Sequence, residues 1–201
     1  MNYSKIKEEA RNKIKGNIWK LIVPFLIVFA IEFLVAGLSF DVNDLDNFGN
    51  NGMTSLVTIL LYPVNFGIIV YYLNFVRGKN IDVKDIFGYY KQFGPIFLLF
   101  FLTGLFTTLW TLLLIIPGII AALSYSMAPY IMADGEIEAI QCINKSKEMM
   151  KGYKWDYFCF QLSFIGWILL GILTLGIVFI YVIPYMQVAD TLYYEELKKI
   201  S

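Results

Sequence analysis

The sequence contains no histidine among its 201 residues, and only 16% of them are charged. The lack of histidine excludes imidazole-assisted serine or cysteine catalysis and most zinc sites. Cys142 and Cys159 are too few for a disulfide framework and do not form a CxxC pair. The sequence also has no nucleotide-binding loop, metal-ligand cluster or nucleophile–base pair. It therefore predicts no catalytic residue, no metal, no cofactor and no enzyme activity.

Charge of one sign is not in excess either, because 16 basic residues balance 16 acidic ones. A nucleic-acid-binding protein needs a basic excess to displace counterions, so that class of partner is excluded. What the sequence does have is apolar residues, which make up 58% of the chain and give a mean hydropathy of +0.63. Average soluble domains are about 45–50% apolar and about 25% charged. Part of this protein's surface is therefore predicted to face lipid.

Lysine and arginine are absent from the interiors of three apolar blocks, which run roughly over Ile18–Phe75, Pro95–Ala133 and Asp156–Tyr194. All 16 basic residues lie before, between or after these blocks, or at the opening of the first. The positive-inside rule places such segments on the cytoplasmic face. Each block must then cross the membrane an even number of times, with both termini cytoplasmic. The first apolar segment is too long for a signal peptide and lacks an A-x-A end. We therefore expect a multi-pass membrane protein whose first apolar segment is retained as a span.

The first block is visibly divided by the loop "DVNDLDNFGNNG", which carries three aspartates and no basic residue. The other two blocks have about 39 residues each. A single helix of that length measures about 58 Å, against about 30 Å for the hydrocarbon core. Each is therefore predicted to contain two spans, with turns at Ile116–Ile119 and Leu173–Gly176. In the former, Pro117 and Gly118 are predicted to separate two helices, because proline lacks an N–H group and glycine accepts positive φ.

The fold class predicted is all-α, a polytopic membrane protein with six transmembrane helices as three hairpins. A short amphipathic interfacial helix precedes each hairpin: one at Ser4–Lys15, one capped by Asp82 and one capped by Asp134. Residues 1–201 form a single membrane domain with repeat-like units 1–76, 77–133 and 134–201. Because all three units are predicted to start on the cytoplasmic face, they are expected to be parallel repeats related by an axis along the membrane normal.

Glu32 is the one charge-capable residue well inside a predicted span, and such residues usually face the bundle interior. With no basic residue in the membrane to pair with it, Glu32 is predicted to be neutral and hydrogen-bonded to a neighbouring helix. The candidate partners are Asn65, Thr103, Thr107 and Gln161. The functional alternative is an intramembrane proton or cation site formed by Glu32, Asn65 and Gln161. We favour the structural interpretation, because one carboxylate without partners is thin evidence for transport.

A second group of candidates lies at the predicted cytoplasmic rim. Asp134 and Asp190 each follow a Pro-Tyr pair in matching hairpins, in "SMAPYIMAD" and "YVIPYMQVAD". They are either a paired cation or headgroup site or, as we favour, a helix cap and an ordinary interfacial acid. Lys145, Lys147 and Lys151 are the basic residues expected to contact anionic lipid headgroups.

The segments "LLLIIPGIIAALSYSMAPYIMAD", "NKSKEMMKGYKWDYFCFQLSFIGW" and "IPYMQVADTLYYEEL" resemble a bacterial membrane family known as domain of unknown function 975. The opening "ARNKIKGNIW" resembles that family as well. The chain is more distantly similar to the membrane-anchor region fused to some glycerophosphodiester phosphodiesterases. The resemblance implies a prokaryotic plasma-membrane protein and supplies no catalytic residues.

These observations leave two classes of function. The first is a non-enzymatic membrane module that binds lipid or a membrane or cytoplasmic partner protein and assists a neighbouring system. The second is a small proton- or cation-coupled transporter or channel with Glu32 in its path.

Overall fold

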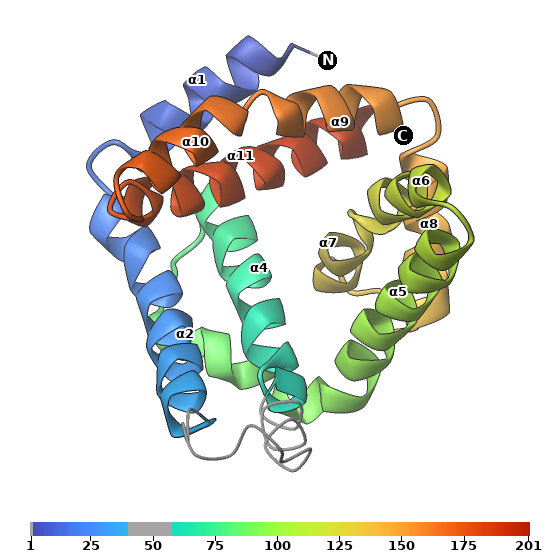
Figure 1. The fold of residues 1–201 in the computed structure, drawn as a ribbon, viewed down its shortest axis with the longest axis horizontal. Helices are drawn as coiled ribbons and strands as arrows, with labels where there is room; N and C mark the ends of the chain where they lie inside the picture. The colour runs from blue at the N-terminus through green and yellow to red at the C-terminus, as the bar shows by residue number, and fades with distance from the viewer. Residues whose placement is uncertain (1, 40–57) are drawn as a thin grey trace.

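The computed structural model describes residues 2–39 and 58–201, so the acidic loop at residues 41–52 lies outside this part. The described chain is helical and contains no strand, which confirms the all-α class. In chain order the helices of Figure 1 are α1 (Tyr3–Ile14), α2 (Ile18–Ser39), α4 (Tyr62–Val76), the 3-10 helix η1 (Val83–Gln92), α5 (Phe93–Leu113), α6 (Ile115–Tyr125), α7 (Ala128–Ala133), α8 (Ala139–Met149), α9 (Lys154–Leu162), α10 (Ile165–Leu173) and α11 (Phe179–Ile200).

Several of these helices are apolar and long enough to cross a membrane. Among the described residues, 4 stretches qualify by length and composition: 58–76, 83–113, 115–133 and 154–173. A fifth qualifies if α1 and the first part of α2, which meet at a 92° bend, are taken as one span. The sixth predicted span falls in α11, which is not among them, and the second half of α11 carries acidic and basic residues. The structure thus supports 4 to 5 candidate spans.

The second apolar block is divided into two helices as predicted, but the turn is not at Pro117-Gly118. It lies at Leu114, which is extended with φ −161° and ψ 142° between α5 and α6. Pro117 occupies the first turn of α6, where a missing N–H costs no helical hydrogen bond. A Cβ added to Gly118 would come within 2.1 Å of Thr111 Oγ1 and 2.7 Å of Thr111 Cα. The glycine is therefore needed for the close approach of α5 and α6, and not for the turn.

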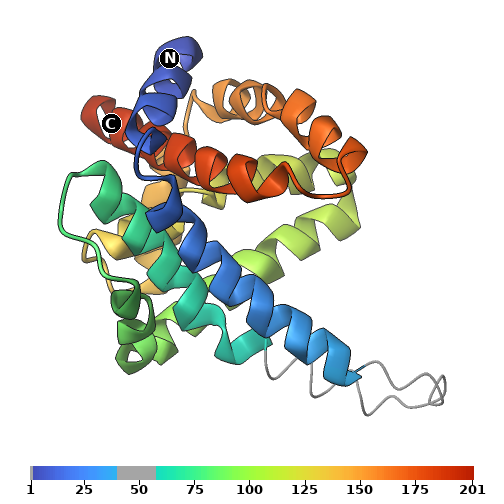
Figure 2. The same cartoon turned by 90° about the vertical axis from the view of Figure 1, so that its left-hand side faces the viewer.

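The turn predicted at Leu173–Gly176 is confirmed. It separates α10 from α11, and it contains Leu175 at φ 51° and Gly176 at φ 92°. Figure 2 shows this turn and the break between α5 and α6 on the same side of the molecule, at the right. The N- and C-termini both lie to the left of them.

The first two amphipathic helices are present as predicted. The apolar face of α1 is buried through Ile6, Ala10 and Ile14, and the helix ends before Gly16 at φ 87°. Asp82 is the N-cap of the second helix, where its side chain accepts a hydrogen bond of 3.0 Å from the Lys84 N–H group. That second element, η1, is a 3-10 helix instead of an α-helix.

The third amphipathic helix is α8, but Asp134 does not cap it. The N-cap of α8 is Glu138, which makes no side-chain capping bond. Asp134 is the C-cap residue of α7, and Gly135, at φ 108°, turns the chain away from that helix. One face of α8 is buried, since Ala139 and Ile143 on the helix and Met150 after it are all buried.

Interruptions inside the long helices are stabilised by side chains from other helices. Pro24 in α2 lacks the N–H group that would donate to the Lys20 carbonyl. The Tyr71 hydroxyl of α4 donates to that carbonyl instead, at 2.9 Å, and Tyr72 donates to the Leu21 carbonyl at 2.7 Å. These two tyrosines therefore tie α4 to the part of α2 that precedes Pro24.

A similar repair joins α8 to the break between α6 and α7. Ser146 of α8 is fully buried, and its hydroxyl donates to the Ser124 carbonyl at 2.7 Å. The same oxygen accepts a hydrogen bond of 3.2 Å from the Met127 N–H group. Pro129 interrupts the helix between α6 and α7, and Ser146 supplies hydrogen-bond partners for one backbone N–H group and one backbone carbonyl next to this break.

The core is centred on α11, which packs against α1, α2, α4 and α10. Its buried aromatic residues include Tyr185 and Tyr193, which contact Phe160 and Phe164 at ring-centroid separations of 5.0 to 5.6 Å. The last helix therefore connects the beginning of the chain with α10.

Candidate functional site

A charge network joins the ends of three distant segments. Arg77, which follows α4, lies 2.7 Å from Asp134 Oδ1 through Nη1 and 2.7 Å from Glu195 Oε1 through Nη2. Two residues of α11 also contact Asp134 Oδ2: Lys198 Nζ at 2.5 Å, and the Tyr194 hydroxyl, which donates at 2.6 Å. Side-chain exposures are only 16% for Asp134 and 23% for Arg77. The network thus links α4, α7 and α11 in a partly buried setting.

The protonation of Asp134 follows from these contacts. Partial burial by itself raises the pKa of Asp134, but the hydrogen bonds from Arg77, Lys198 and Tyr194 outweigh burial and lower the pKa to about 2. The hydrogen bond to Asp134 in turn raises the pKa of Arg77. Both groups are therefore charged at neutral pH, and the pair is an internal tie.

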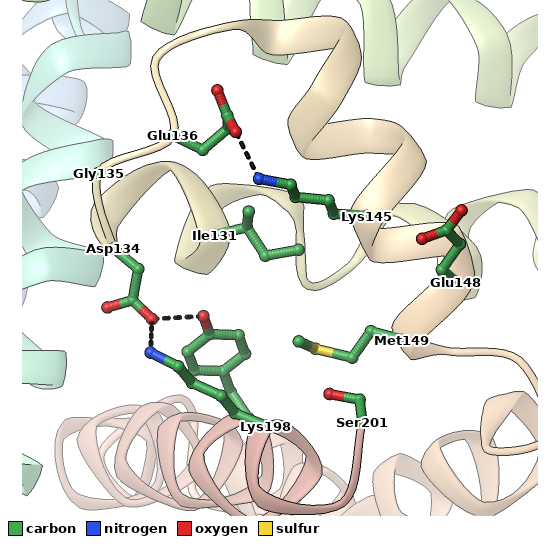
Figure 3. A pocket seen from close by; sticks show the side chains of 10 residues that line it. Ile131, Asp134, Gly135, Glu136, Lys145, Glu148, Met149, Lys198 and Ser201 are labelled. Atoms are coloured by element: carbon green, nitrogen blue, oxygen red, sulfur yellow. Dashed lines mark hydrogen bonds and ion pairs between the residues drawn. The ribbon is translucent and has the colours of Figure 1, made fainter.

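Beside this network lies a recess of about 640 Å³, shown in Figure 3. Its walls bring Lys145, Glu136 and Glu148 close to Asp134 and Lys198. Figure 3 shows Lys145 directed at Glu136 and Lys198 directed at Asp134, and these ion pairs each measure 2.5 Å. Because both lysines already have a carboxylate partner, a charged ligand would have to displace an existing ion pair. The recess therefore fits a structural role better than ligand binding.

The structure brings Asp134 and Lys145 to the same recess but does not pair Asp134 with Asp190. Asp190 Oδ1 instead accepts a hydrogen bond of 2.7 Å from Gln161 Nε2, which also lies 2.7 Å from the Tyr157 hydroxyl. Gln161 was expected as a partner for Glu32, and it is a partner of Asp190. The paired-aspartate site at the rim is not formed by the described residues.

The intramembrane candidates are also separated from one another. The Glu32 side chain is exposed on α2, so the expectation that it faces the bundle interior is wrong. None of the described groups expected to hydrogen-bond Glu32 does so. Asn65 is half-buried and lines a cavity of about 260 Å³ whose other walls are mostly apolar, including Phe25, Val28 and Phe100. Which face of α2 packs against the other helices depends on the tertiary structure, so the residue type of Glu32 alone did not predict its exposure.

The two remaining rim lysines have different surroundings. Lys147 Nζ lies 5.4 Å from the centroid of the Tyr125 ring, within cation–π range. Lys151 is exposed just after α8. Neither forms an ion pair within the described part of the chain.

Sequence reasoning missed a basic recess at the bend between α1 and α2. This lysine recess, of about 440 Å³, is lined by Lys13, Lys15, Lys20 and Lys79, together with three asparagines and no acidic residue. The positive φ of Gly16 and of Gly78 turns the two lysine-bearing segments toward one another. Lys13 Nζ donates to the Val76 carbonyl at 3.1 Å, so α1 is held against the end of α4. The sequence feature that could have predicted this recess is that Lys15 directly precedes Gly16 and Lys79 directly follows Gly78.

Comparison with other proteins identifies a family but no characterised relative. No curated protein and no solved structure matches the chain. A family match covers residues 1–120 and 111–201, and therefore the whole chain. The protein belongs to the family described as protein of unknown function DUF975.

Proposed function

We propose that this protein crosses the plasma membrane of a prokaryote six times, as three hairpins with both termini cytoplasmic. We further propose that it acts there as a non-enzymatic module that binds anionic lipid headgroups at its cytoplasmic rim and assists a neighbouring membrane system. The membrane character rests on the apolar helices, and the mode of binding rests on the lysine recess.

The topology is supported by where the turns lie. The α5–α6 break and the α10–α11 turn share one side of the molecule in Figure 2, away from the termini. We expect cysteines introduced at Asn47, Leu114 and Thr174 to react with an impermeant thiol reagent from outside intact cells. Asn47 lies outside the described residues, and Leu114 is chosen because it is 64% exposed at the break.

The control positions for this labelling experiment, all predicted to be cytoplasmic, are Lys13, Lys84, Lys147 and Lys198. Cysteines at these sites should react only after the cells are opened. External labelling at Lys147 would contradict the even number of crossings in the second block. The native Cys142 and Cys159 are replaced by alanine beforehand, so that each variant carries a single thiol.

The lysine recess is the observation that carries the binding function. Four ammonium groups line one concave surface without an acid among its walls, and within the described part of the chain only Lys13 of the four has an acidic partner, Glu9 at 3.9 Å, so the potential there is positive. The exposed Trp19 directly precedes Lys20 at the start of α2, a position typical of tryptophan at a membrane interface. Each well-placed base contributes about 1 kcal/mol to binding of an anionic surface.

The alternative, a proton- or cation-coupled transporter, has less support. Such a protein needs a continuous polar path, and Glu32, Asn65 and Gln161 lie in separate surroundings. A flux that is lost in a well-folded Glu32→Gln variant, while lipid binding is unchanged, would favour the transporter.

The binding function is tested by measuring affinity for phosphatidylglycerol and phosphatidylcholine vesicles with the full chain in nanodiscs or detergent. We expect a preference for phosphatidylglycerol that weakens with salt, because exposed charges are screened beyond about 8 Å at physiological ionic strength. Replacing Lys15, Lys20 and Lys79 with glutamine should lower that affinity up to about 100-fold, from about 1 kcal/mol per base. Lys13 is left in place because it also holds α4.

The matched control replaces Lys5, Lys84 and Lys91, which are equally charged but lie outside the recess. We expect this control to bind nearly as well as the unmodified protein. Equal affinity for the two vesicle types, or an equal loss in both triple variants, would refute the assignment of the lysine recess.

A further inference from the structure

Another recess lies against α6, near the beginning of α9. This groove has a volume of about 360 Å³. One wall is apolar and is formed by Trp110 of α5 with Pro117, Ile120 and Ala121 of α6. Lys147 and Lys154 complete the lining, with the hydroxyl-bearing Ser124 and Tyr125. The groove thus combines a hydrocarbon surface with two positive charges.

The charges of this groove are not neutralised from within the protein. No acidic residue lines it, and neither Lys147 nor Lys154 forms an ion pair with any described residue. Lys145, two residues earlier on α8, is bound to Glu136 and so differs from Lys147. Two ammonium groups held beside an apolar surface without a counter-ion are complementary to an anion that carries its own hydrocarbon.

The two parts of the groove are also ordered along α6. Lys147 Nζ lies over the ring of Tyr125, at the end of α6. Pro117 is eight residues earlier, which corresponds to about 12 Å along the helix axis. The groove therefore has a basic end beside Tyr125 and an apolar wall that extends from it toward Pro117.

We propose that this groove binds one anionic diacyl phospholipid, with its phosphate between Lys147 and Lys154 and one acyl chain along the apolar wall of α6. The inference deepens the proposed function, on which it rests, by adding a site that holds the lipid's hydrocarbon as well as its charge. Phosphatidylcholine fits the wall equally but brings a cationic group to the lysines, so an anionic headgroup is favoured. A free phosphate ion would satisfy the lysines and leave the wall uncovered.

The test is native mass spectrometry of the full chain in mild detergent, titrated with dioleoyl phosphatidylglycerol. Lys147→Gln combined with Lys154→Gln should weaken retention of the lipid about tenfold, since about 1 kcal/mol is lost per base and water already screens part of it. Ala121→Phe, which fills the wall while leaving both charges, should also reduce retention. The matched control is Lys84→Gln combined with Lys91→Gln, which should have no effect on this site.

Two further measurements identify what occupies the groove. Glycerol phosphate, which has the charge without the hydrocarbon, should not displace the lipid; displacement at equal concentration would show a site for free phosphate and overturn the proposal. A protein dimer that disappears in the Lys147/Lys154 variant would show that a second copy occupies the groove, which also overturns it. Because Lys147 and Lys154 are not core residues, the double variant remains informative if Ala121→Phe fails to fold.

The outcome also separates this inference from the proposed function. If the unmodified protein prefers phosphatidylglycerol and the Lys15/Lys20/Lys79 variant loses that preference, while the Lys147/Lys154 variant binds normally, only the groove assignment is wrong. If the unmodified protein shows no preference for phosphatidylglycerol, the proposed function itself fails.

Discussion

Ser146→Ala tests whether the hydroxyl that bridges α8 to the α6–α7 break stabilises the fold. The substitution removes a donor to the Ser124 carbonyl, at 2.7 Å, and an acceptor for the Met127 N–H group, at 3.2 Å. Ser146 and Met127 are both completely buried, so water cannot easily replace the lost contacts. At about 1 kcal/mol for each hydrogen bond, the expected destabilisation is about 2 kcal/mol.

For a chain of this length, that loss corresponds to a decrease in Tm of about 4–8 °C. The measurement is thermal unfolding of the purified protein in one detergent, followed by circular dichroism. Ser126→Ala is the matched control, because the hydroxyl of Ser126, the C-cap residue of α6, donates only to the Leu123 carbonyl three residues earlier. We expect the control to change Tm by less than about 2 °C. Equal Tm values for the two variants would refute the bridging role of Ser146.

Three other predictions follow from the described contacts. Gly118→Ala should destabilise the protein by about 1–3 kcal/mol, since the added Cβ would overlap Thr111. The control Gly104→Ala should be neutral or stabilising in the same Tm assay, because no atom lies within 4 Å of the added Cβ. The pKa of Asp134 is lowered to about 2 from 3.8, so the ionised side chain contributes fully to the free energy of unfolding above pH 3.8, and this contribution is lost as the pH falls toward 2. After allowance for solvent screening, the contribution amounts to about 1 kcal/mol. Asp134→Asn should therefore remove that pH dependence, and an unchanged pH profile of stability would contradict it. Glu32→Gln should leave Tm within about 2 °C of the unmodified value, because the exposed Glu32 side chain makes no described hydrogen bond.

Much of the local structure was predictable because it depends on neighbouring residues and on the thickness of a membrane. The buried face of α1 follows from the spacing of Ile6, Ala10 and Ile14, and the start of η1 follows from the capping side chain of Asp82. The division of the second apolar block follows from its length, since no single helix of that size fits one membrane crossing. Family membership was predictable as well, because it rests on sequence patterns distributed along the whole chain.

The tertiary structure decided which of these residues meet. The turn lies at Leu114, before Pro117, and Gly118 packs against Thr111, a contact between two helices that sequence does not display. Asp134 does not cap α8 and is instead bound by Arg77 and Lys198, which are distant from it in sequence.

The candidate binding surfaces depended most on the three-dimensional fold. The sequence determined that lysines gather at the ends of the apolar blocks, since membrane topology requires it. It did not determine that Lys15 and Lys79 share one acid-free recess, while Lys145 is neutralised by Glu136. The physical reason is that side-chain charges act over a few ångströms, and those distances are set by helix bends and rotations that residue order alone does not specify.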